Sequence, residues 1–398
     1  MLQIEKAPSK DALNAIHWDT PGRLDALLAQ IDRPVAATLD RALGGRELDF
    51  DDGMRLAQAR GRELEALVLA ADHIRRNRVG DVITYVVNRN INFTNICFVG
   101  CRFCAFSRAP RQSDAYFHSF DEIQRRAREA WEMGAREVCV QGGLPRDLEP
   151  FYYRDLLRAI KTATPGMHVH AFSPMEVVYG VELTGMPLKD YLAMLKDAGL
   201  GTLPGTAAEI LDDDVRHQIE RIKLKVSQWL DVIRTAHRLG IRTTSTMMYG
   251  HTESAEHWVR HLMLLRDVQK ETGGFTEFVP LGFVHEFTQL YRSGDARPGP
   301  TVEEHLKVHA LSRLMLQGWI DNIQVSWVKM SREITQACLR AGANDYGGTL
   351  MNENISREAG STSGEYLSPE EFQTRIRELG RTPAERTTLY EIVRTYAD

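Results

Sequence analysis

From residue 81 onwards, short apolar segments alternate with longer amphipathic ones. Eight of the short segments are predicted to be strands, because apolar, β-branched and aromatic residues fill them and glycine, proline or polar residues bound them. They cover residues 81–91, 136–143, 167–174, 201–205, 242–250, 275–283, 322–328 and 344–350. The pattern therefore predicts many short strands separated by helices.

The longer segments place apolar residues at three- and four-residue intervals, which is typical of helices with one buried face. They begin at Phe120, Pro150, Leu188, Lys225, Ser254, Val302 and Arg332, and several end in glycine, as helices often do. Regular alternation of this kind predicts an α/β fold, a (β/α)8-type TIM barrel. A doubly wound open sheet is the alternative architecture, but no G-x-G-x-x-G motif follows the first strand.

Three segments are expected along the chain. Residues 1–80 form a helical N-terminal segment, interrupted at Gly44-Gly45, and residues 81–351 form the barrel. Residues 352–398 form a C-terminal extension that is predicted to be helical and then irregular.

Composition excludes several classes of protein. The formal net charge is −5 and the chain is 43% hydrophobic, which argues against nucleic-acid binding and is ordinary for a globular protein. No stretch approaches the roughly 18 apolar residues of a membrane helix, and the N-terminus lacks the pattern of a signal peptide. With five cysteines, three of them clustered, a cytoplasmic location is expected rather than a disulfide framework.

The clustered cysteines are Cys97, Cys101 and Cys104, spaced C-x3-C-x2-C directly after the first predicted strand. Structural zinc sites usually have four protein ligands, and no second pair of cysteines is present here. Cys139 and Cys338 lie in apolar segments and are interpreted as small buried hydrophobic residues. In a [4Fe–4S] cluster, three thiolates would leave one iron open to a non-protein ligand. A non-catalytic zinc or iron–sulfur protein with a further protein ligand is the alternative.

Polar residues and glycines follow several of the predicted strands, at the end of the barrel where active sites lie. Candidate ligand-binding positions are Gln141, Gly142, Gly143, Ser173 and Glu209, and candidate catalytic positions are Glu176, Tyr249 and His251. Further polar strand positions that could contact a substrate or form structural ion pairs are His168, His170, Glu253, Glu277, Ser326, Lys329, Asn344, Asp345 and Thr349. Glu209 could equally be a first-turn helix residue.

The cysteine spacing after the first barrel strand resembles the signature of the radical S-adenosylmethionine (SAM) superfamily. That resemblance implies a [4Fe–4S] cluster whose open iron binds the amino and carboxylate groups of SAM. After reduction by an electron donor, SAM would yield methionine and a 5′-deoxyadenosyl radical. The resemblance also places Phe103 against the adenine of SAM and Gly142-Gly143 at its amino group.

Longer stretches narrow the resemblance. The segments "HAFSPMEVVYG", "TTSTMMYGHTESAEHW" and "GANDYGGTLMNENISREAG" are similar to the second-subunit family of 7,8-didemethyl-8-hydroxy-5-deazariboflavin (FO) synthase. This implies a transferase that cleaves L-tyrosine and adds its 4-hydroxybenzyl group to 5-amino-6-(D-ribitylamino)uracil. With one cysteine triad in this chain, a second radical SAM subunit that closes the deazaflavin ring is implied as a partner.

Three segments depart from the pattern expected of that family: residues 281–283 (LGF), 329–331 (KMS) and 218–229. Loop changes at the end of a barrel can alter substrate choice without touching the cluster. A related radical SAM enzyme of the futalosine route to menaquinone is therefore the alternative within the superfamily.

Overall fold

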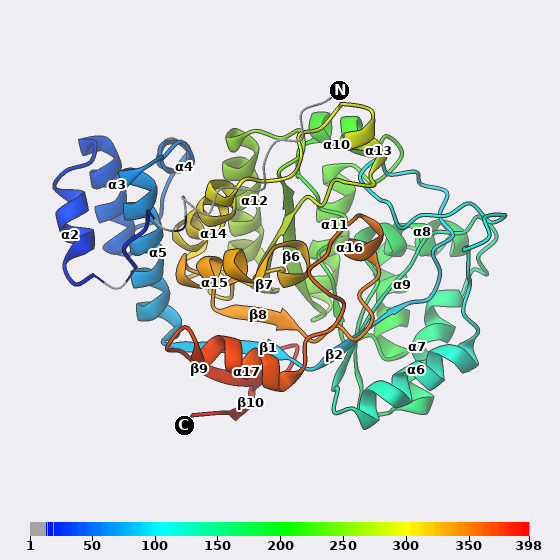
Figure 1. Cartoon of the computed structure of the whole chain (residues 1–398). Coiled ribbons are helices and arrows are strands. Elements are labelled where there is room, and N and C mark those ends of the chain that lie inside the picture. Colours follow the sequence, from blue (N-terminus) through cyan, green and yellow to red (C-terminus); the bar gives the residue numbers. More distant parts are fainter. Residues whose placement is uncertain (1–12, 14, 19, 398) are drawn as a thin grey trace.

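The computed structural model describes residues 13, 15–18 and 20–397, and its centre is a six-stranded parallel sheet (Figure 1). The strand order β2-β3-β4-β5-β6-β7 follows the chain, as helical crossovers between parallel strands allow. These strands are β2 (Asn88–Asn92), β3 (Glu137–Gln141), β4 (His168–Ala171), β5 (Thr202–Leu203), β6 (Arg242–Tyr249) and β7 (Phe275–Gly282). The molecule is therefore an α/β protein with a parallel half-barrel.

A second sheet has the order β10-β9-β1-β8. Its strands are β1 (Val82–Val86), β8 (Asp345–Gly348), β9 (Thr382–Arg386) and β10 (Ile392–Thr395). The predicted strand 81–91 is thus divided at Val87, because its first half pairs with β8 and β9 whereas its second half pairs with β3. One continuous piece of chain joins the two sheets.

The predicted strand at 322–328 is wrong as a regular strand. Only isolated bridges link Ile323 to Phe278 of β7 and Gln324 to Asp345 of β8, and the 3-10 helix η1 (Trp327–Lys329) follows. The Asn344 side chain accepts the Ile323 N–H at 2.9 Å, so a side chain takes a hydrogen bond that a ladder would use. The regular eight-stranded barrel expected from the sequence is corrected to a half-barrel with a small adjoining sheet.

All seven predicted helices from residue 120 to residue 340 are present, and three more were missed. The helices from this range are α6 (Phe120–Glu132), α7 (Tyr152–Ala163), α8 (Pro174–Thr184), α9 (Leu188–Asp197), α10 (Asp213–Ile219), α11 (Val226–Arg238), α12 (Ala255–Thr272), α13 (Gln289–Arg292), α14 (Val302–Leu316) and α15 (Arg332–Arg340). Besides the four-residue α13, the sequence missed α8 and α10, whose patterns were interpreted as loops after strands. α8 is apolar nearly all round, so its sequence lacks the one-sided pattern of a surface helix.

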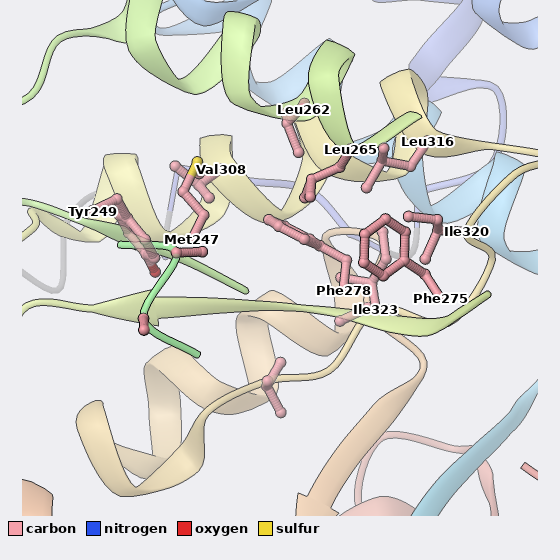
Figure 2. Close-up of a cluster of buried hydrophobic side chains, with 14 of the residues drawn as sticks. Met247, Tyr249, Leu262, Leu265, Phe275, Phe278, Val308, Leu316, Ile320 and Ile323 are labelled. Carbon is pink, nitrogen blue, oxygen red and sulfur yellow. The ribbon is translucent and has the colours of Figure 1, made fainter. Parts of the chain in front are cut away.

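The N-terminal helices are α2 (Arg23–Leu28), α3 (Arg33–Leu43), α4 (Phe50–Ala57) and α5 (Arg62–Val79), and they form a layer on one flank (Figure 1). Of these, α4 and α5 pack on α14, which is buried along almost its whole length, and α2 and α3 pack on α5. Figure 2 shows the core beneath, where Leu262 and Leu265 of α12 meet Phe275 and Phe278 of β7. The flank therefore belongs to the same hydrophobic core as the sheet.

The C-terminal extension contains α16 (Ile355–Glu358), α17 (Pro369–Arg377) and then the two strands β9 and β10. The sequence pattern predicted only helix and irregular chain here, so both strands are additions. β9 runs parallel to β1, and β10 returns antiparallel along β9. No helix in the described part of the chain is long and apolar enough to cross a membrane.

Candidate iron–sulfur and substrate site

The cysteine loop lies between β2 and α6, at the carboxyl end of the half-barrel. Hydrogen bonds of Cys97 N–H to Arg108 O (3.1 Å) and Arg108 N–H to Asn95 O (2.8 Å) fold the loop back on its own base. Cys97, Cys101 and Cys104 are all free thiols, and all three line one cavity of about 170 Å³. We refer to this space as the thiol cavity.

Two glycines at the end of β3 form part of the cavity wall. A side chain at Gly143 would place its Cβ 2.2 Å from the carbonyl oxygen of Ile96, so only glycine lets the cysteine loop approach this closely. A Cβ at Gly142 would meet the ring of Phe93 at 2.6 Å. Gln141, just before them, donates to Thr206 Oγ1 at 2.7 Å.

Glu176 ties the glycine pair to the start of α8. Its carboxylate accepts the Gly142 N–H at 3.0 Å and both the N–H and the hydroxyl of Ser173, at 2.6 and 2.7 Å. The Ser173 hydroxyl in turn accepts the Glu176 N–H, which completes a capping box. Burial raises the pKa of Glu176 to about 7. Both residues line the thiol cavity, and their hydrogen bonds hold its wall in place.

Glu209, which also lines the thiol cavity, forms an ion pair with the buried Lys223. Lys223 Nζ lies 2.6 Å from Glu209 Oε1 and 3.1 Å from Glu220 Oε2. Burial alone would lower the pKa of Lys223, but the two carboxylates outweigh it and raise the pKa. Lys223 also lies 5.1 Å from the centre of the Phe103 ring. Lys223 could not be recognised in the sequence, since a lone lysine between α10 and α11 has no distinguishing pattern.

The donor set of the thiol cavity fits an iron–sulfur cluster. Burial raises the pKa of the Cys101 and Cys104 thiols, so a bound cation is needed to keep them as thiolates. Within the described part of the chain, no three His, Cys, Asp or Glu side chains are grouped tightly enough to hold one metal ion. A [4Fe–4S] cluster asks for a different arrangement, with each cysteine thiolate on its own iron.

Two predicted positions do not reach the thiol cavity. Tyr249 is fully buried among the helices that cover β6, as Figure 2 shows, and its hydroxyl lies 2.6 Å from Nδ1 of His305. His251 is buried too, with Nε2 3.1 Å from Met248 O and Nδ1 3.4 Å from a carboxylate oxygen of Glu253. Neither side chain is among those that line the cavity.

Several weaker candidates lie at the amino end of the strands instead. Asp345 and Glu277 both contact Arg386 of β9, at 2.5 and 3.5 Å, and Glu277 also accepts the Tyr390 hydroxyl. His170 lies within β4, as its third residue, and is hydrogen-bonded to Thr202 Oγ1 at 2.7 Å. Of the two interpretations left open for Glu277, the structure shows the ion pair.

A second cavity is larger, with a volume of about 530 Å³. We call it the side cavity. It is bounded by the end of β7, by η1 and the start of α15, and by residues 360–363. The sequence did not predict it, since its walls come from segments far apart in the chain.

Comparison with known proteins places this geometry in a family. A model described as the radical SAM superfamily matches residues 91–265, and one described as the CofH/MqnC C-terminal region matches residues 272–397. The 5-amino-6-(D-ribitylamino)uracil–L-tyrosine 4-hydroxyphenyl transferase of Methanocaldococcus jannaschii is 52% identical over 326 residues, which are 81% of this chain and 91% of that protein.

The chain belongs to the CofH family of the radical SAM superfamily. Some longer relatives contain a CofH-like part. The FO synthase of Mycobacterium leprae is 54% identical over 342 residues, which are 86% of this chain but 40% of that protein. This CofH chain therefore spans about two fifths of the length of the FO synthases that it matches.

Solved structures share the fold at low identity. The hydrogenase maturase HydG from Carboxydothermus hydrogenoformans aligns with a TM-score of 0.70 and 15% identity, covering 92% of this chain and 84% of that one. Methylornithine synthase (PylB) aligns with a TM-score of 0.68 and 18% identity, covering 87% and 97%. Both are likenesses of fold alone.

The segments that depart from the expected CofH pattern can now be located. Gly282 packs against His305, where an added Cβ would lie 2.9 Å from the ring, and Phe283 lines the side cavity. All of residues 329–331 line the side cavity as well. The third segment, 218–229, carries Lys223 to the thiol cavity. The departures thus border the two cavities.

Proposed function

We propose that this chain is a tyrosine-cleaving radical SAM transferase that acts in FO synthesis. The observation that carries the proposal is the three free thiols of one loop on one cavity, in a chain 52% identical to such a transferase over most of its length. Its substrates would be L-tyrosine and 5-amino-6-(D-ribitylamino)uracil. In the net reaction, tyrosine would lose a hydrogen atom to the 5′-deoxyadenosyl group of SAM and divide at its Cα–Cβ bond into a two-carbon imine and a 4-hydroxybenzyl group. The 4-hydroxybenzyl group would join C5 of the uracil as the adduct loses one proton and one electron, and SAM, the net oxidant, would end as methionine and 5′-deoxyadenosine.

The cofactors of this reaction are a [4Fe–4S] cluster and SAM, which together supply a 5′-deoxyadenosyl radical when they are bound and reduced. Cys97, Cys101 and Cys104 would hold the cluster. The backbone at Gly142 and Gly143, kept in place by Glu176, would receive the amino group of SAM, and Phe103 would lie against the adenine. Lys223, paired with Glu209, keeps that wall ordered and close to charge balance.

The partners follow from the same relatives. Since the chain spans about two fifths of the FO synthases, a second radical SAM subunit would close the deazaflavin ring, and a cytoplasmic electron donor would reduce the cluster. Residues 81–351 would form the catalytic domain built on the half-barrel, flanked by the segments 1–80 and 352–398.

An anaerobic assay tests the proposal. The protein is reconstituted with iron and sulfide and incubated with SAM, dithionite, ring-labelled tyrosine and ribitylaminouracil, and the products are analysed by mass spectrometry. An adduct that carries the labelled 4-hydroxybenzyl group is expected only when both substrates are present. If 5′-deoxyadenosine forms without any labelled adduct, the assignment of the substrates is wrong.

One alternative is favoured by a specific observation. The model that matches residues 272–397 is shared between CofH and MqnC, so by itself it does not choose between these two groups. The related enzyme of the futalosine route is therefore tested in parallel, with futalosine-type substrates replacing tyrosine and ribitylaminouracil. Turnover of such a substrate alone would favour the alternative.

A further inference from the structure

The side cavity has the size of a substrate site, and the thiol cavity does not. Ligand sites are usually about 300–1,000 Å³. The thiol cavity, at about 170 Å³, falls below this range, whereas the side cavity, at about 530 Å³, lies within it. A reaction with two organic substrates beside SAM needs more room than the thiol cavity offers.

The linings of the two cavities are connected through one hydrogen bond. Lys329 lines the side cavity and donates to the Ser356 hydroxyl at 2.9 Å. Ile355, the neighbour of Ser356 in the chain, lines the thiol cavity. Lys329, Ser356 and Ile355 thus connect the lining of the side cavity to that of the thiol cavity.

His305 presents one defined hydrogen-bond donor to the side cavity. Its Nδ1 lies 2.6 Å from the hydroxyl of Tyr249, and that hydroxyl has no other partner among the described residues. If Nδ1 carried the proton, the buried phenol hydrogen would have no acceptor, which is costly. Tyr249 therefore donates to Nδ1, and the neutral ring carries its proton on Nε2. No described residue contacts that Nε2 by a hydrogen bond, and His305 lines the cavity.

The rest of the wall suits a neutral, hydroxylated ligand. Phe283 and Trp327 supply apolar ring surface. The hydroxyls of Ser361 and Ser363 donate to the carbonyl oxygens of Val328 and Met330, and the Ser361 oxygen also accepts the Ser363 N–H at 3.3 Å. Each hydroxyl oxygen thus keeps at least one lone pair that can accept from a ligand.

Most charged groups that line the side cavity have a charged partner. Arg332 pairs with Glu378, Arg375 lies 3.7 Å from Glu371, and Glu286 lies 3.9 Å from His285. Lys329 donates to the Ser356 hydroxyl, and its other N–H groups can donate to a ligand. Such donors suit the carbonyl oxygens of a pyrimidine, and the serine oxygens suit the hydroxyl groups of a polyol chain.

We propose that the side cavity binds the ribitylaminouracil substrate, and that His305 Nε2–H donates to a carbonyl oxygen of its pyrimidine ring. Tyr249 is a positioning residue that fixes the His305 tautomer. This inference rests on the proposed function, because it assigns a place to the second substrate of that reaction.

Equilibrium binding tests the inference without turnover. Ribitylaminouracil is titrated anaerobically into the reconstituted protein with SAM and tyrosine but no reductant. Relative to wild type, His305→Leu should raise Kd about tenfold, since it removes one hydrogen bond to a neutral acceptor. His305→Gln keeps an N–H donor near the Nε2 position and should recover most of the affinity. Tyr249→Phe frees the His305 tautomer and should raise Kd about threefold.

The matched control is Tyr191→Phe. Tyr191 is as buried as Tyr249, but its hydroxyl has no hydrogen-bond partner in the described structure, so Kd should not change. Thermal unfolding of each variant shows whether it is folded, and if His305→Leu does not fold, the comparison of Tyr249→Phe with Tyr191→Phe decides.

Three results would overturn the assignment of the side cavity. The first is an unchanged Kd in the folded His305 and Tyr249 variants. The second is no binding of ribitylaminouracil to a wild-type protein that still forms the adduct. The third is that these variants show a higher KM for tyrosine and an unchanged KM for ribitylaminouracil. A failure of the proposed function is distinct, because then wild type forms no adduct at all.

Discussion

The two ends of the half-barrel both contain buried carboxylates, but they treat them differently. At the carboxyl end, Glu176, Glu209 and Glu220 lie around or beside the thiol cavity. At the amino end, the C-terminal segment covers the carboxylates: Arg386 contacts Asp345, Thr388 contacts Glu137, and Tyr390 contacts Glu277. Buried carboxylates are thus covered by protein at the amino end and line or adjoin a cavity at the carboxyl end.

The difference separates two tasks. In parallel α/β barrels, reactive groups gather at the carboxyl ends of the strands, and the other end serves stability. Here the amino end is closed by residues that come last in the chain, so the final strands complete the fold. Substitutions at the carboxyl end should therefore lower activity with little loss of unfolding free energy. Substitutions at the amino end should lower the unfolding free energy with little loss of cluster binding.

The largest effect is expected from the thiols. Replacing Cys97, Cys101 or Cys104 by alanine should reduce adduct formation by more than about 10³-fold, because each thiolate holds one iron. The unfolding free energy of the protein without its cluster should change little. Cys139→Ala, on β3, is the control and should keep both the visible spectrum and the activity. Full activity in any of the three loop variants contradicts the assignment.

The next effect should appear at the amino end. Arg386→Met leaves Asp345 and Glu277 buried without their cation, which should cost about 3–5 kcal/mol in urea unfolding. Iron content per folded molecule should stay as in wild type. Arg394→Met, on the exposed strand β10, should change stability by less than about 0.5 kcal/mol. Equal losses in both variants would mean that the closure contributes nothing specific.

A pH series sharpens the account of the amino end. Burial raises the pKa of Glu277 in the folded protein from about 4.5 to about 7, and Arg386 opposes the shift only in part. The stability linked to this group is therefore full below about pH 4.5 and is lost as the pH rises through about 7. The difference in unfolding free energy between Glu277→Gln and wild type should therefore grow by about 2 kcal/mol, in favour of the variant, as the pH rises from 5 to 8. A parallel course of the two pH curves would contradict the shift.

The smallest effect compares two capping boxes. Ser173 and Ser368 each begin a helix that has proline at its start and a glutamate three residues after the cap. Replacing either serine by alanine should cost about 1 kcal/mol of stability. Only Ser173→Ala should also raise the KM for SAM, by a few fold, because Ser173 helps to hold Glu176 on Gly142. A similar KM in both variants would show that the capping box is structural alone.

Much of this arrangement can be predicted from the sequence, for identifiable physical reasons. The cysteine spacing is local, so it survives without knowledge of the fold, and the long amphipathic helices carry their own pattern. β9 was missed because Pro383 lies in it and a proline weakens any strand prediction. The sequence could not show on which face of the sheet the Tyr249 side chain lies. Alternation along β6 shows that neighbouring side chains face opposite sides of the sheet, but not which side faces the interior of the half-barrel.

Other features depend on contacts between distant residues. The failure of 322–328 to form a strand follows from the side chain of Asn344, about twenty residues later. Lys223 is held at the thiol cavity by its ion pairs with Glu209 and Glu220. The hydrogen bond between Tyr249 and His305 joins β6 to α14. No local pattern reports such pairs.

The most direct test of the central claim is the metal content of the anaerobically reconstituted protein. We expect about four irons and four sulfides per chain in wild type and in Cys139→Ala, and almost none when Cys97, Cys101 and Cys104 are all replaced by alanine. About one zinc per chain with no sulfide, or iron retained by the triple variant, would contradict the account.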